Sequence, residues 1–461
     1  MNEKTLTYNG KEVAETDWKV IHTLKTRINN KFDFEITEGH ITKLNLNNCY
    51  LSFLAKDISK LFFLEELLLD DNRLTKIPDS ILHLENLQVL SLENNPISSI
   101  PTEFEKLDSI HYLNLNNNRL SLVPNCLEDF TKLKVLNLGN NKISEIPDFF
   151  ENFEFLETLN LENNQIQKIS SNITKLKNLK TLKLPDNQIS SIPEDINLLE
   201  SLQELNLRNN RIDTIPDSIN ELKELLILDL EGIAIFQWPK IEQLKNLKKL
   251  WIGKNKISEI PPRLGELNAL EFLDLDSLQI YTLPDELGSL KKLKQINLGG
   301  TPLQKFPDTL GDCDSLEYLR LEWGSGLSYM PESLGNLVNL KALLLGASGL
   351  SQLPESLGNL RNLERLTIFR NYMEKLPDNI GNCKKLEHIT MDSCNIKSLP
   401  SSMGDCESLK ELFIHNNPLK TLPDSFKKLK SLKVLNISGT EIDSTIGTVK
   451  YLMDHGVEIR T

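Results

Sequence analysis

A single pattern of leucine, isoleucine, asparagine and proline recurs along almost the whole chain, beginning at Ile41. Its clearest copy reads Leu87-x-x-Leu90-x-Leu92-x-x-Asn95-x-Ile97-x-x-Ile100-Pro101-x-x-Phe104-x-x-Leu107. A fixed period of this length constrains the fold strongly, because each repeat is one small structural unit that cannot bury its apolar face alone. The sequence therefore predicts a stack of coils whose stability comes from contacts between neighbours.

Eighteen such repeats follow one another, and we number them 1 to 18 in chain order, with position 1 as the first apolar residue of each. The period is 23 residues, except that it is 22 after Leu225 and 24 after Leu316. The repeats begin at Ile41, Leu64, Leu87, Ile110, Leu133, Leu156, Leu179, Leu202, Leu225, Leu247, Leu270, Leu293, Leu316, Leu340, Leu363, Leu386, Leu409 and Leu432.

The spacing inside one repeat predicts its local structure. Leu90 and Leu92, at positions 4 and 6, indicate a short strand with one buried face. Asn95 at position 9 turns the chain out of the strand, and its amide can satisfy backbone groups of that turn and of the next coil. Pro101 removes a donor and fixes φ, which predicts an extended or 3₁₀ return arm. Proline fills this slot throughout repeats 2 to 17, except where Ser170 replaces it.

These elements together predict an α/β fold. We expect a curved, horseshoe-like solenoid with a parallel β-sheet on its concave face. The convex face would carry 3₁₀, short helical or extended segments. Because strands are narrower than the convex arms, the sheet is expected on the inside of the curve.

Composition agrees with such a stack and argues against two classes of partner. Hydrophobic residues are 39% of the chain but aromatic residues only 6%, so the core has to be aliphatic. The net charge of −13 argues against nucleic acid, since phosphate binding needs a concentrated basic surface. No stretch reaches the roughly 18–20 apolar residues of a membrane span, and residues 1–15 lack the apolar run of a signal peptide. We expect a cytoplasmic monomer that binds neither nucleic acid nor membrane.

The repeated residues resemble those of the leucine-rich-repeat family from Ile41 to about Ile446. The 23-residue form with Ile/Leu-Pro-x-x-Ile/Leu-x-x-Leu is similar to the intracellular subclass related to the Ras group. This resemblance implies a leucine-rich-repeat solenoid that serves as a protein-recognition scaffold. It also implies a small GTPase or a phosphatase as the partner, a class that rests on the resemblance alone.

The two ends are expected to cap the array, because an open stack would expose an apolar face at each end. We predict an N-terminal cap at residues 1–40, the array at 41–445 and a C-terminal cap at 446–461. Thr16 is the expected N-cap of an amphipathic helix, followed by a strand at 32–36. A partner-binding helix is the alternative reading of that helix. Its apolar stripe consists of Trp18, Ile21, Leu24 and Ile28.

Irregular repeats concentrate in the second half of the chain. Repeat 9 is one residue short between Pro239 and Ile241, and repeat 13 has an insertion at 323–326. These changes are either drift that a robust stack tolerates or a bend near residues 225–350 that shapes a pocket. The residues that replace asparagine at position 9 there are Ile233, Leu278, Thr301, Ser348, Cys394 and Thr440.

The sequence carries no recognisable catalytic or phosphate-binding motif. Cys383, Cys394 and Cys406 could be imagined as a metal cluster, but the spacing assigns Cys394 to the opposite turn from the other two. Buried structural thiols are the favoured interpretation. We therefore expect no catalytic residues, no metal and no cofactor, and a chain that is not an enzyme.

The outward positions of the strands divide the concave face into two regions. Repeats 1 to 8 carry mainly asparagine and acids, including Asn45, Asp70, Glu93 and Asn114, which predicts a solvated face. Four acids follow in the next repeats, and they either form a solvated face or hold a cation or a basic partner strip. These acids are Asp229, Glu231, Asp274 and Asp276.

Aromatic and arginine residues then gather on repeats 10 to 17, and these types dominate interface hot spots. We predict that repeats 13 to 17 bind a folded protein, with Trp323, Phe369 and Phe413 as apolar anchors and Arg320 and Arg370 as charge-pairing groups. The alternative is that the aromatic residues cover one another as cross-strand pairs. The predicted partner-binding residues are Trp251, Tyr318, Arg320, Trp323, Phe369, Arg370, Tyr372, His388, Phe413 and His415.

Three functions compete at this point. The favoured one is a non-enzymatic scaffold in signalling. The second is a recognition subunit for an enzyme supplied in trans, such as a ubiquitin-ligase-like effector. The third is a secreted or receptor-type recognition module, against which the missing signal peptide and missing cysteine-rich caps count.

Overall fold

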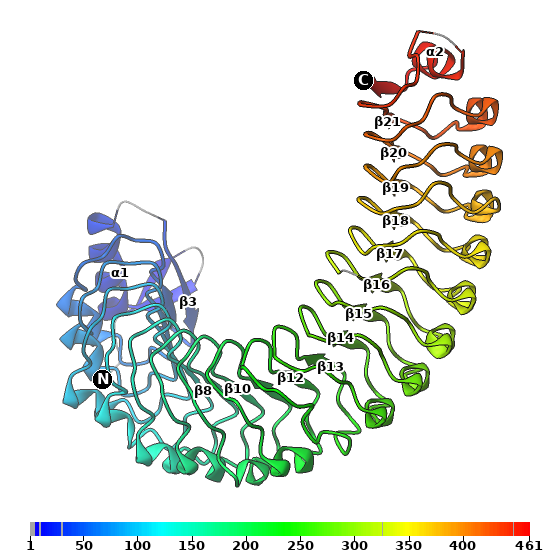
Figure 1. Cartoon of the computed structure of the whole chain (residues 1–461). Coiled ribbons are helices and arrows are strands. Elements are labelled where there is room, and N and C mark those ends of the chain that lie inside the picture. The colour runs from blue at the N-terminus through cyan, green and yellow to red at the C-terminus, as the bar shows by residue number, and fades with distance from the viewer. Residues whose placement is uncertain (1–4, 9–10, 29–30, 325, 446) are drawn as a thin grey trace. The chain divides into compact units, whose positions relative to one another are not determined.

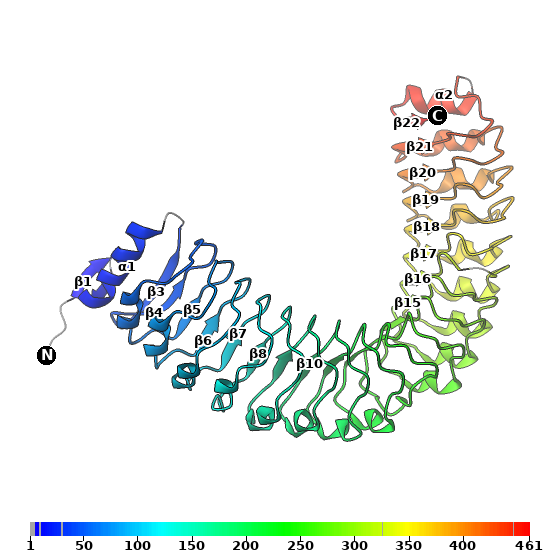
Figure 2. The same ribbon diagram turned by 60° about the vertical axis from the view of Figure 1, so that its left-hand side comes forward.

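A computed structural model describes residues 5–8, 11–28, 31–324, 326–445 and 447–461. The chain divides into two compact parts, Met1–Leu225 and Leu226–Thr461, which we call the N-terminal part and the C-terminal part. Within each part the coils stack into a solenoid with strands on one side and 3₁₀ helices on the opposite side (Figures 1 and 2). The predicted leucine-rich-repeat solenoid is confirmed.

A small layer precedes the repeats. β1 (Thr5–Tyr8) and β2 (Lys11–Ala14) form an antiparallel hairpin that the sequence did not indicate. α1 (Glu15–Arg27) follows, and β3 (Asp33–Thr37) pairs antiparallel with β4 (His40–Asn45), the first strand of the repeats. The predicted helix and strand are present, and the division into caps and array stays a prediction.

The predicted N-cap of α1 is wrong. The helix begins at Glu15 with Ala14 as its N-cap, so Thr16 lies inside the first turn and donates its hydroxyl to Asp17 Oδ1 at 3.2 Å. Asp17 is 2% exposed, and its Oδ2 accepts the backbone N–H of Ile41 at 2.8 Å. This bond ties α1 to the start of repeat 1, where a buried N–H would otherwise lack a partner.

Each repeat contributes one short strand to a parallel ladder with nearly constant register. In the N-terminal part β4 continues through β5 (Glu66–Leu68), β6 (Val89–Ser91), β7 (Tyr112–Asn114), β8 (Val135–Asn137), β9 (Thr158–Asn160), β10 (Thr181–Lys183) and β11 (Glu204–Asn206).

The C-terminal part repeats this arrangement. After its last repeat come a short helix, α2 (Gly447–Asp454), and a final strand. Its strands are β12 (Ile227–Asp229), β13 (Lys249–Trp251), β14 (Phe272–Asp274), β15 (Gln295–Asn297), β16 (Tyr318–Arg320), β17 (Ala342–Leu344), β18 (Arg365–Thr367), β19 (His388–Thr390), β20 (Glu411–Phe413), β21 (Val434–Asn436) and β22 (Glu458–Arg460).

The return arms are 3₁₀ helices of three to five residues, as the prolines predict. Those of the N-terminal part are η1 (Lys56–Lys60), η2 (Asp79–His83), η3 (Thr102–Lys106), η4 (Asn125–Leu127), η5 (Asp148–Asn152), η6 (Ser171–Lys175), η7 (Ile196–Leu198) and η8 (Asp217–Glu221). Those of the C-terminal part are η9 (Pro262–Glu266), η10 (Asp285–Ser289), η11 (Asp308–Asp312), η12 (Glu332–Asn336), η13 (Glu355–Asn359), η14 (Ile380–Asn382), η15 (Ser401–Asp405) and η16 (Asp424–Lys428). The short repeat 9 has none.

Position 9 holds neighbouring coils together as predicted. The Asn95 amide donates to the carbonyl oxygens of Leu69, Leu92 and Glu93 at 2.9–3.1 Å, and its Oδ1 accepts the N–H of Leu74 at 3.0 Å. Because Asn95 is only 2% exposed, these four bonds satisfy backbone groups that water cannot reach. Thr301 and Ser348 replace asparagine in two later repeats and donate to a carbonyl of their own turn, and the Ser348 hydroxyl also lies 3.3 Å from Asn371 Oδ1 in the next repeat.

A row of glycines brings the 3₁₀ helices of the C-terminal part close together. These glycines occupy the same place in seven successive helices. A Cβ on Gly311 would lie 2.3 Å from the carbonyl oxygen of Ser333 in the next helix, so a larger residue cannot fit without movement. The row consists of Gly265, Gly288, Gly311, Gly335, Gly358, Gly381 and Gly404.

Candidate functional site

We call the outward side of each parallel ladder, formed by positions 3, 5 and 7 of the repeats, its strand face. In the C-terminal part the register aligns position 5 of successive strands, so Arg320 lies opposite Leu344 and Leu344 opposite Thr367. The same row continues through Thr390 to Phe413. Residues that are 23 or 24 positions apart in sequence are therefore neighbours on this face.

The structure brings together three of the predicted site residues, Trp323, Phe369 and Arg370, which we call the aromatic–arginine cluster. The rings of Trp323 and Phe369 meet edge to face with centroids 5.5 Å apart. The guanidinium carbon of Arg370 lies 5.5 Å from the centroid of the Trp323 ring, within range of a cation–π contact. The cluster joins repeats 13 and 15.

Gly346, in the repeat between them, makes this contact possible. A Cβ on Gly346 would lie 2.3 Å from Phe369 Cε1 and 2.5 Å from Phe369 Cζ. The Phe369 ring therefore lies over the glycine and reaches toward Trp323. Any side chain at position 346 would occupy space that the phenyl ring fills.

Two members of the cluster adopt a backbone conformation that their side chains disfavour. Trp323 has φ of 61° and Arg370 has φ of 52°, both in the left-handed region. Position 8 is left-handed in most repeats, and in the N-terminal part it is mainly asparagine or aspartate, such as Asn94 and Asn117. Asparagine tolerates this region better than tryptophan or arginine does, so the cluster carries a local cost in backbone energy.

The cluster remains accessible to solvent although its members contact one another. Trp323 is 57% exposed, and Tyr372, two residues after Arg370 in the chain, is 74% exposed. Arg370 is also exposed, and no ion pair involves it in the described parts of the chain. Tyr318 on β16 is exposed too.

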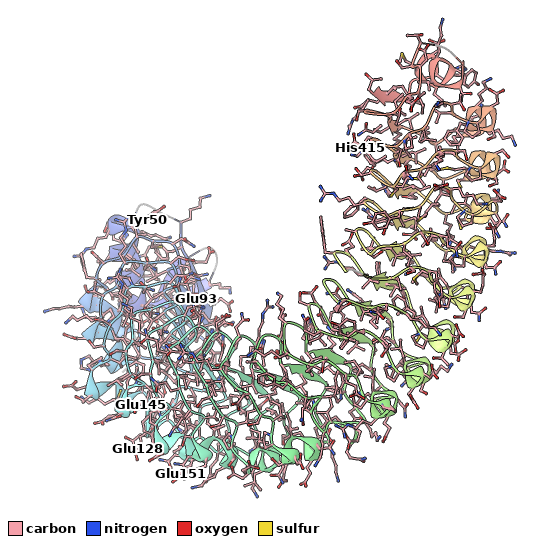
Figure 3. The ribbon with its side chains drawn as sticks, viewed as in Figure 1. Tyr50, Glu93, Glu128, Glu145, Glu151 and His415 are labelled. Atoms are coloured by element: carbon pink, nitrogen blue, oxygen red, sulfur yellow. The ribbon has the colours of Figure 1, made fainter. Side chains whose placement is uncertain are left out.

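The other predicted charged residues have partners within the chain. Arg320 Nε lies 2.9 Å from Glu322 Oε2, so this guanidinium is paired before any partner binds. His388 Nδ1 lies 3.0 Å from Glu411 Oε2, and His415 Nε2 lies 3.6 Å from Asp392 Oδ2. Figure 3 shows His415 on the strand side of the C-terminal part.

Trp251 and Phe413 lie apart from the cluster. The half-buried ring of Trp251 contacts Phe272 on the next strand, with centroids 4.6 Å apart. Phe413 at the end of β20 lies under the guanidinium of Arg460, 6.0 Å from its ring centroid. Trp251 makes a cross-strand ring contact and Phe413 a cation–π contact. Among the described residues, neither ring makes a ring contact with Trp323.

The four acids at the ends of β12 and β14 and just after them are buried or half-buried, unlike the side chains of a fully solvated face. Asp229 and Glu231 are 8% and 6% exposed, and Lys254 Nζ lies 2.6 Å from Glu231 Oε1. Burial raises the pKa of Asp274, although hydrogen bonds from Asn297 and from the backbone of Asp276 partly oppose this. No group of three or more potential metal ligands was found among the described residues.

The strand face of the N-terminal part is polar, and its groups satisfy one another. Asp70 Oδ1 accepts the backbone N–H of Glu93 at 2.8 Å and the hydroxyl of Ser91 at 2.5 Å. Glu93, which Figure 3 shows on the strand side, accepts from Asn114 and Asn116, each at 2.9 Å. Burial raises the pKa of Asp70. This network has few unsatisfied groups to offer a ligand.

All six cysteines are free and buried. The thiols of Cys313, Cys383 and Cys406 donate to carbonyl oxygens of the preceding coil at 3.4–3.6 Å. Burial raises the pKa of each of these three to about 12, so they remain neutral. The interpretation as buried structural thiols is confirmed.

Sequence reasoning missed the residues that organise the cluster. Gly346 is one signal that could have been found, because glycine at position 7 alternates with larger residues in repeats 9 to 15. Glu322 is another, since it lies two residues after Arg320 on the same face of a strand. The contact of Phe413 with Arg460 depends on the C-terminal strand, which no repeat pattern reaches.

In the described residues, no helix has both the length and the apolar character needed to cross a membrane.

Comparison with solved structures finds proteins of the same fold. A leucine-rich-repeat protein of Leptospira interrogans is 28% identical with a TM-score of 0.69, covering 91% of this chain and 95% of that one. The leucine-rich-repeat ectodomain of the Arabidopsis thaliana receptor kinase GASSHO1/SCHENGEN3, solved with CASPARIAN STRIP INTEGRITY FACTOR 2, is 25% identical. Its TM-score is 0.66, covering 93% of this chain and 63% of that one.

A third similar structure is the plant peptide hormone receptor RGFR1, solved in complex with RGF2. It is 26% identical with a TM-score of 0.55, and the match covers 87% of this chain and 78% of that one. A comparison with curated protein sequences gave no match.

Four family models match the chain. A leucine-rich repeat region matches residues 172–253 and 326–448, and three shorter leucine-rich-repeat models match residues 63–120, 108–152 and 155–176. The intracellular Ras-group-related subclass is not among them. By these matches, its repeat spacing and its fold, the chain belongs to the leucine-rich-repeat family.

Proposed function

We propose that this chain is a non-enzymatic scaffold that binds a folded protein through the aromatic–arginine cluster on the strand face of its C-terminal part. The cluster supplies an aromatic anchor in Trp323, a second aromatic surface in Phe369 and a guanidinium in Arg370. Tryptophan, tyrosine and arginine contribute most strongly to interface hot spots. The neighbouring Tyr318, Tyr372, His388 and His415 would contribute contacts at its rim.

One observation carries this proposal: Trp323 is 57% exposed although its ring contacts both Phe369 and Arg370. Cross-strand packing for stability alone would bury the ring. A ring that already contacts its neighbours loses less entropy when a partner covers it than a ring without contacts would, and covering it removes apolar surface from water.

The class of the partner is proposed from the family resemblance. The Ile/Leu-Pro-x-x-Leu signature supports a small GTPase or a phosphatase by resemblance only. Because all six cysteines are free, a reducing compartment such as the cytoplasm is part of the proposal. A recognition subunit that presents targets to an enzyme in trans would use the same surface.

A peptide ligand is the second candidate. Two of the similar structures support it, a receptor-kinase ectodomain solved with CASPARIAN STRIP INTEGRITY FACTOR 2 and the peptide hormone receptor RGFR1 solved with RGF2. The positions around the cluster also include small residues, with Thr367 and Thr390 in the central row. The mass of a cross-linked partner distinguishes the two candidates.

The test is affinity capture from native lysate, with the wild type compared with the double variant Phe369→Ala plus Arg370→Ala. The matched control is Tyr50→Ala plus Arg73→Ala, because Arg73 lies 5.2 Å from the ring of Tyr50, which is 64% exposed. That pair has the same chemistry but belongs to the N-terminal part, where Figure 3 labels Tyr50.

The proposal expects a partner that the wild type and the Tyr50/Arg73 variant capture equally and that the Phe369/Arg370 variant loses. Quantitative mass spectrometry measures this difference. All three proteins must melt at similar temperatures for the comparison to count. If a well-folded Phe369/Arg370 variant captures the same partners as the wild type, the proposal is wrong.

A further inference from the structure

A groove of about 830 Å³ runs along the C-terminal part, away from the strand face. It follows the Leu-Pro corner of repeats 12 to 16, where the chain enters the 3₁₀ helices. These repeats carry β15 to β19 in Figure 1. The volume is in the range of sites that bind ligands or peptide segments.

The groove has an apolar floor. Met330, Leu353 and Leu376 occupy the same position in three successive repeats, and each is followed by a proline that also lines the groove. Tyr329 stands at the rim with 44% of its surface exposed. Because Met330, Leu353 and Leu376 are only 3%, 7% and 1% exposed, the Tyr329 ring is the main apolar surface that can accept the aliphatic part of a long side chain.

The opposite rim is acidic. Asp308, Glu332 and Glu355 line the groove as the first residues of η11, η12 and η13, one in each successive repeat. Glu332 Oε2 accepts the backbone N–H of Ser356 at 3.2 Å, which aims this carboxylate toward the next repeat. Glu355 is held in the same way by the N–H of Asp378 at 3.3 Å. Within the described ranges, none of these three carboxylates takes part in an ion pair.

The cations of the lining do not neutralise this rim. Lys397 Nζ lies 2.5 Å from Glu374 Oε1, so these two lining residues compensate each other. Lys375 is the remaining cation against three carboxylates. The groove therefore has a negative balance, with the charge concentrated on one side of an apolar floor.

From this arrangement we propose that the groove binds an extended, basic segment of a partner protein. Lysine and arginine combine an aliphatic stem with a cationic head. The groove offers the Tyr329 ring and the exposed edges of its floor for the stems, beside a row of carboxylates for the heads. The Tyr329 ring adds a surface for a cation–π contact. This surface is separate from the aromatic–arginine cluster, so the inference does not depend on the proposed function.

The length of the groove fits a short segment. At the strand spacing of about 4.8 Å, five repeats extend over roughly 19 Å, and the wider corner of the repeats extends further, so an extended chain of at least about six residues covers the groove. Successive side chains of an extended segment point to opposite sides. In a segment of this length, two or three cationic heads therefore point toward the acidic rim. An acidic segment would face repulsion from the same rim.

The probe is a short labelled peptide that alternates arginine and serine, with a peptide that alternates glutamate and serine for comparison. Fluorescence anisotropy at low salt measures binding to the full chain. The test variant is Glu332→Gln plus Glu355→Gln. The matched control is Glu128→Gln plus Glu145→Gln, which removes the same charge from exposed positions of the N-terminal part (Figure 3).

We expect the arginine peptide to bind the wild type and the Glu128/Glu145 variant with equal affinity. The Glu332/Glu355 variant should bind it roughly tenfold more weakly, as two lost charge pairs imply. Tyr329→Ala should also weaken binding. Equal weakening in both double variants would indicate general attraction to an acidic protein and would overturn the proposal. Binding of the glutamate peptide, or of neither peptide, would overturn it as well.

Discussion

The phenyl ring of Phe369 occupies the space where a side chain of Gly346 would lie, since a Cβ on Gly346 would come within 2.3 Å of Phe369 Cε1. This relationship links three successive repeats, because the glycine in the middle repeat lets Phe369 reach Trp323. The cluster therefore forms only when these three repeats are stacked on one another.

Replacing Gly346 with alanine should displace Phe369 and separate it from Trp323. We expect the free energy of unfolding to fall by about 1–3 kcal/mol, the usual cost of overpacking, and partner capture to fall with it. Thermal melting and quantitative capture check this. Gly349→Ala is no suitable control because φ there is +95°, whereas Ser351→Ala changes an exposed side chain nearby. Unchanged capture by Gly346→Ala would show that the Phe369–Trp323 contact is dispensable.

Arg370→Asn separates a functional role of the cluster from a stabilising one. Asparagine relieves the left-handed strain at φ of 52° by about 1 kcal/mol. The lost cation–π contact with Trp323 costs about 0.5–1 kcal/mol. The two effects nearly cancel, so the melting temperature should stay almost constant while partner capture falls. A clear drop in melting temperature with full capture would instead assign Arg370 to stability.

Asn371, directly after Arg370, should be among the costliest positions to change. Its Oδ1 accepts the N–H groups of Ser348, Gly349 and Leu350, and its amide donates to the carbonyls of Leu345, Ile368 and Phe369. Asn371→Ala leaves these buried groups without partners and should cost about 2–4 kcal/mol.

Denaturant unfolding measures the effect of Asn371→Ala, with Ser348→Ala as its comparison. The Ser348 hydroxyl donates to the carbonyl of Leu345 at 2.7 Å and lies 3.3 Å from Asn371 Oδ1. Asn371 Oδ1 keeps its backbone donors when Ser348 is changed, so the loss of this hydroxyl should cost only about 1 kcal/mol. Equal costs for the two variants would contradict the role assigned to position 9.

The buried thiols predict a specific loss of stability at alkaline pH. Burial raises the pKa of Cys313, Cys383 and Cys406 to about 12, above the value of an exposed thiol. Between the two values the unfolded chain has lost these protons and the folded chain still holds them. The thiols therefore stabilise the fold fully below about pH 8.5, and this contribution is lost as pH rises toward 12.

The variant with all three of these cysteines changed to alanine should show a shallower decline in unfolding free energy above about pH 8.5 than the wild type. Denaturant unfolding at several alkaline pH values measures the two slopes. Lysine titration affects both proteins equally, so the difference isolates the thiols. Parallel profiles would mean that the thiols already ionise in the folded chain.

The repeat pattern predicts most of the fold because each apolar position has one structural role. Leu90 and Leu92 lie on the buried side of a strand, Asn95 bonds its own turn and the preceding coil, and Pro101 precedes a 3₁₀ helix. The hairpin of β1 and β2 escaped prediction because four-residue strands outside a repeat have no periodic signal. The N-cap of α1 was misassigned to Thr16 since both Thr16 and Ala14 precede the apolar stripe, and side-chain type favoured threonine.

The candidate site was predictable by residue type but not by arrangement. Trp323 and Phe369 were expected as anchors together with Phe413, yet only the first two touch, and Phe413 contacts Arg460 from the C-terminal strand. Arg320 was expected to pair with a partner, but Glu322 already pairs with it. Such contacts depend on rotamers and on the left-handed backbone at position 8, neither of which a spacing pattern specifies.

The groove at the Leu-Pro corner escaped prediction for a related reason. The sequence assigned the proline of each repeat to the return arm, and no binding surface was predicted at this corner. The acidic rim becomes visible only when Glu332 and Glu355 are seen as neighbours in successive 3₁₀ helices.

Site-specific photocross-linking shows whether a partner contacts the C-terminal part through the aromatic–arginine cluster. A photoreactive amino acid replaces Tyr372, which is 74% exposed and lies two residues after Arg370 in the chain. It is compared in native lysate with the same group in place of Tyr281, which is 52% exposed in repeat 11. We predict that one partner cross-links at position 372 and does not cross-link at position 281. This cross-link should disappear when Phe369→Ala plus Arg370→Ala is added. A partner that cross-links equally at both positions, or that survives the loss of Phe369 and Arg370, would contradict it.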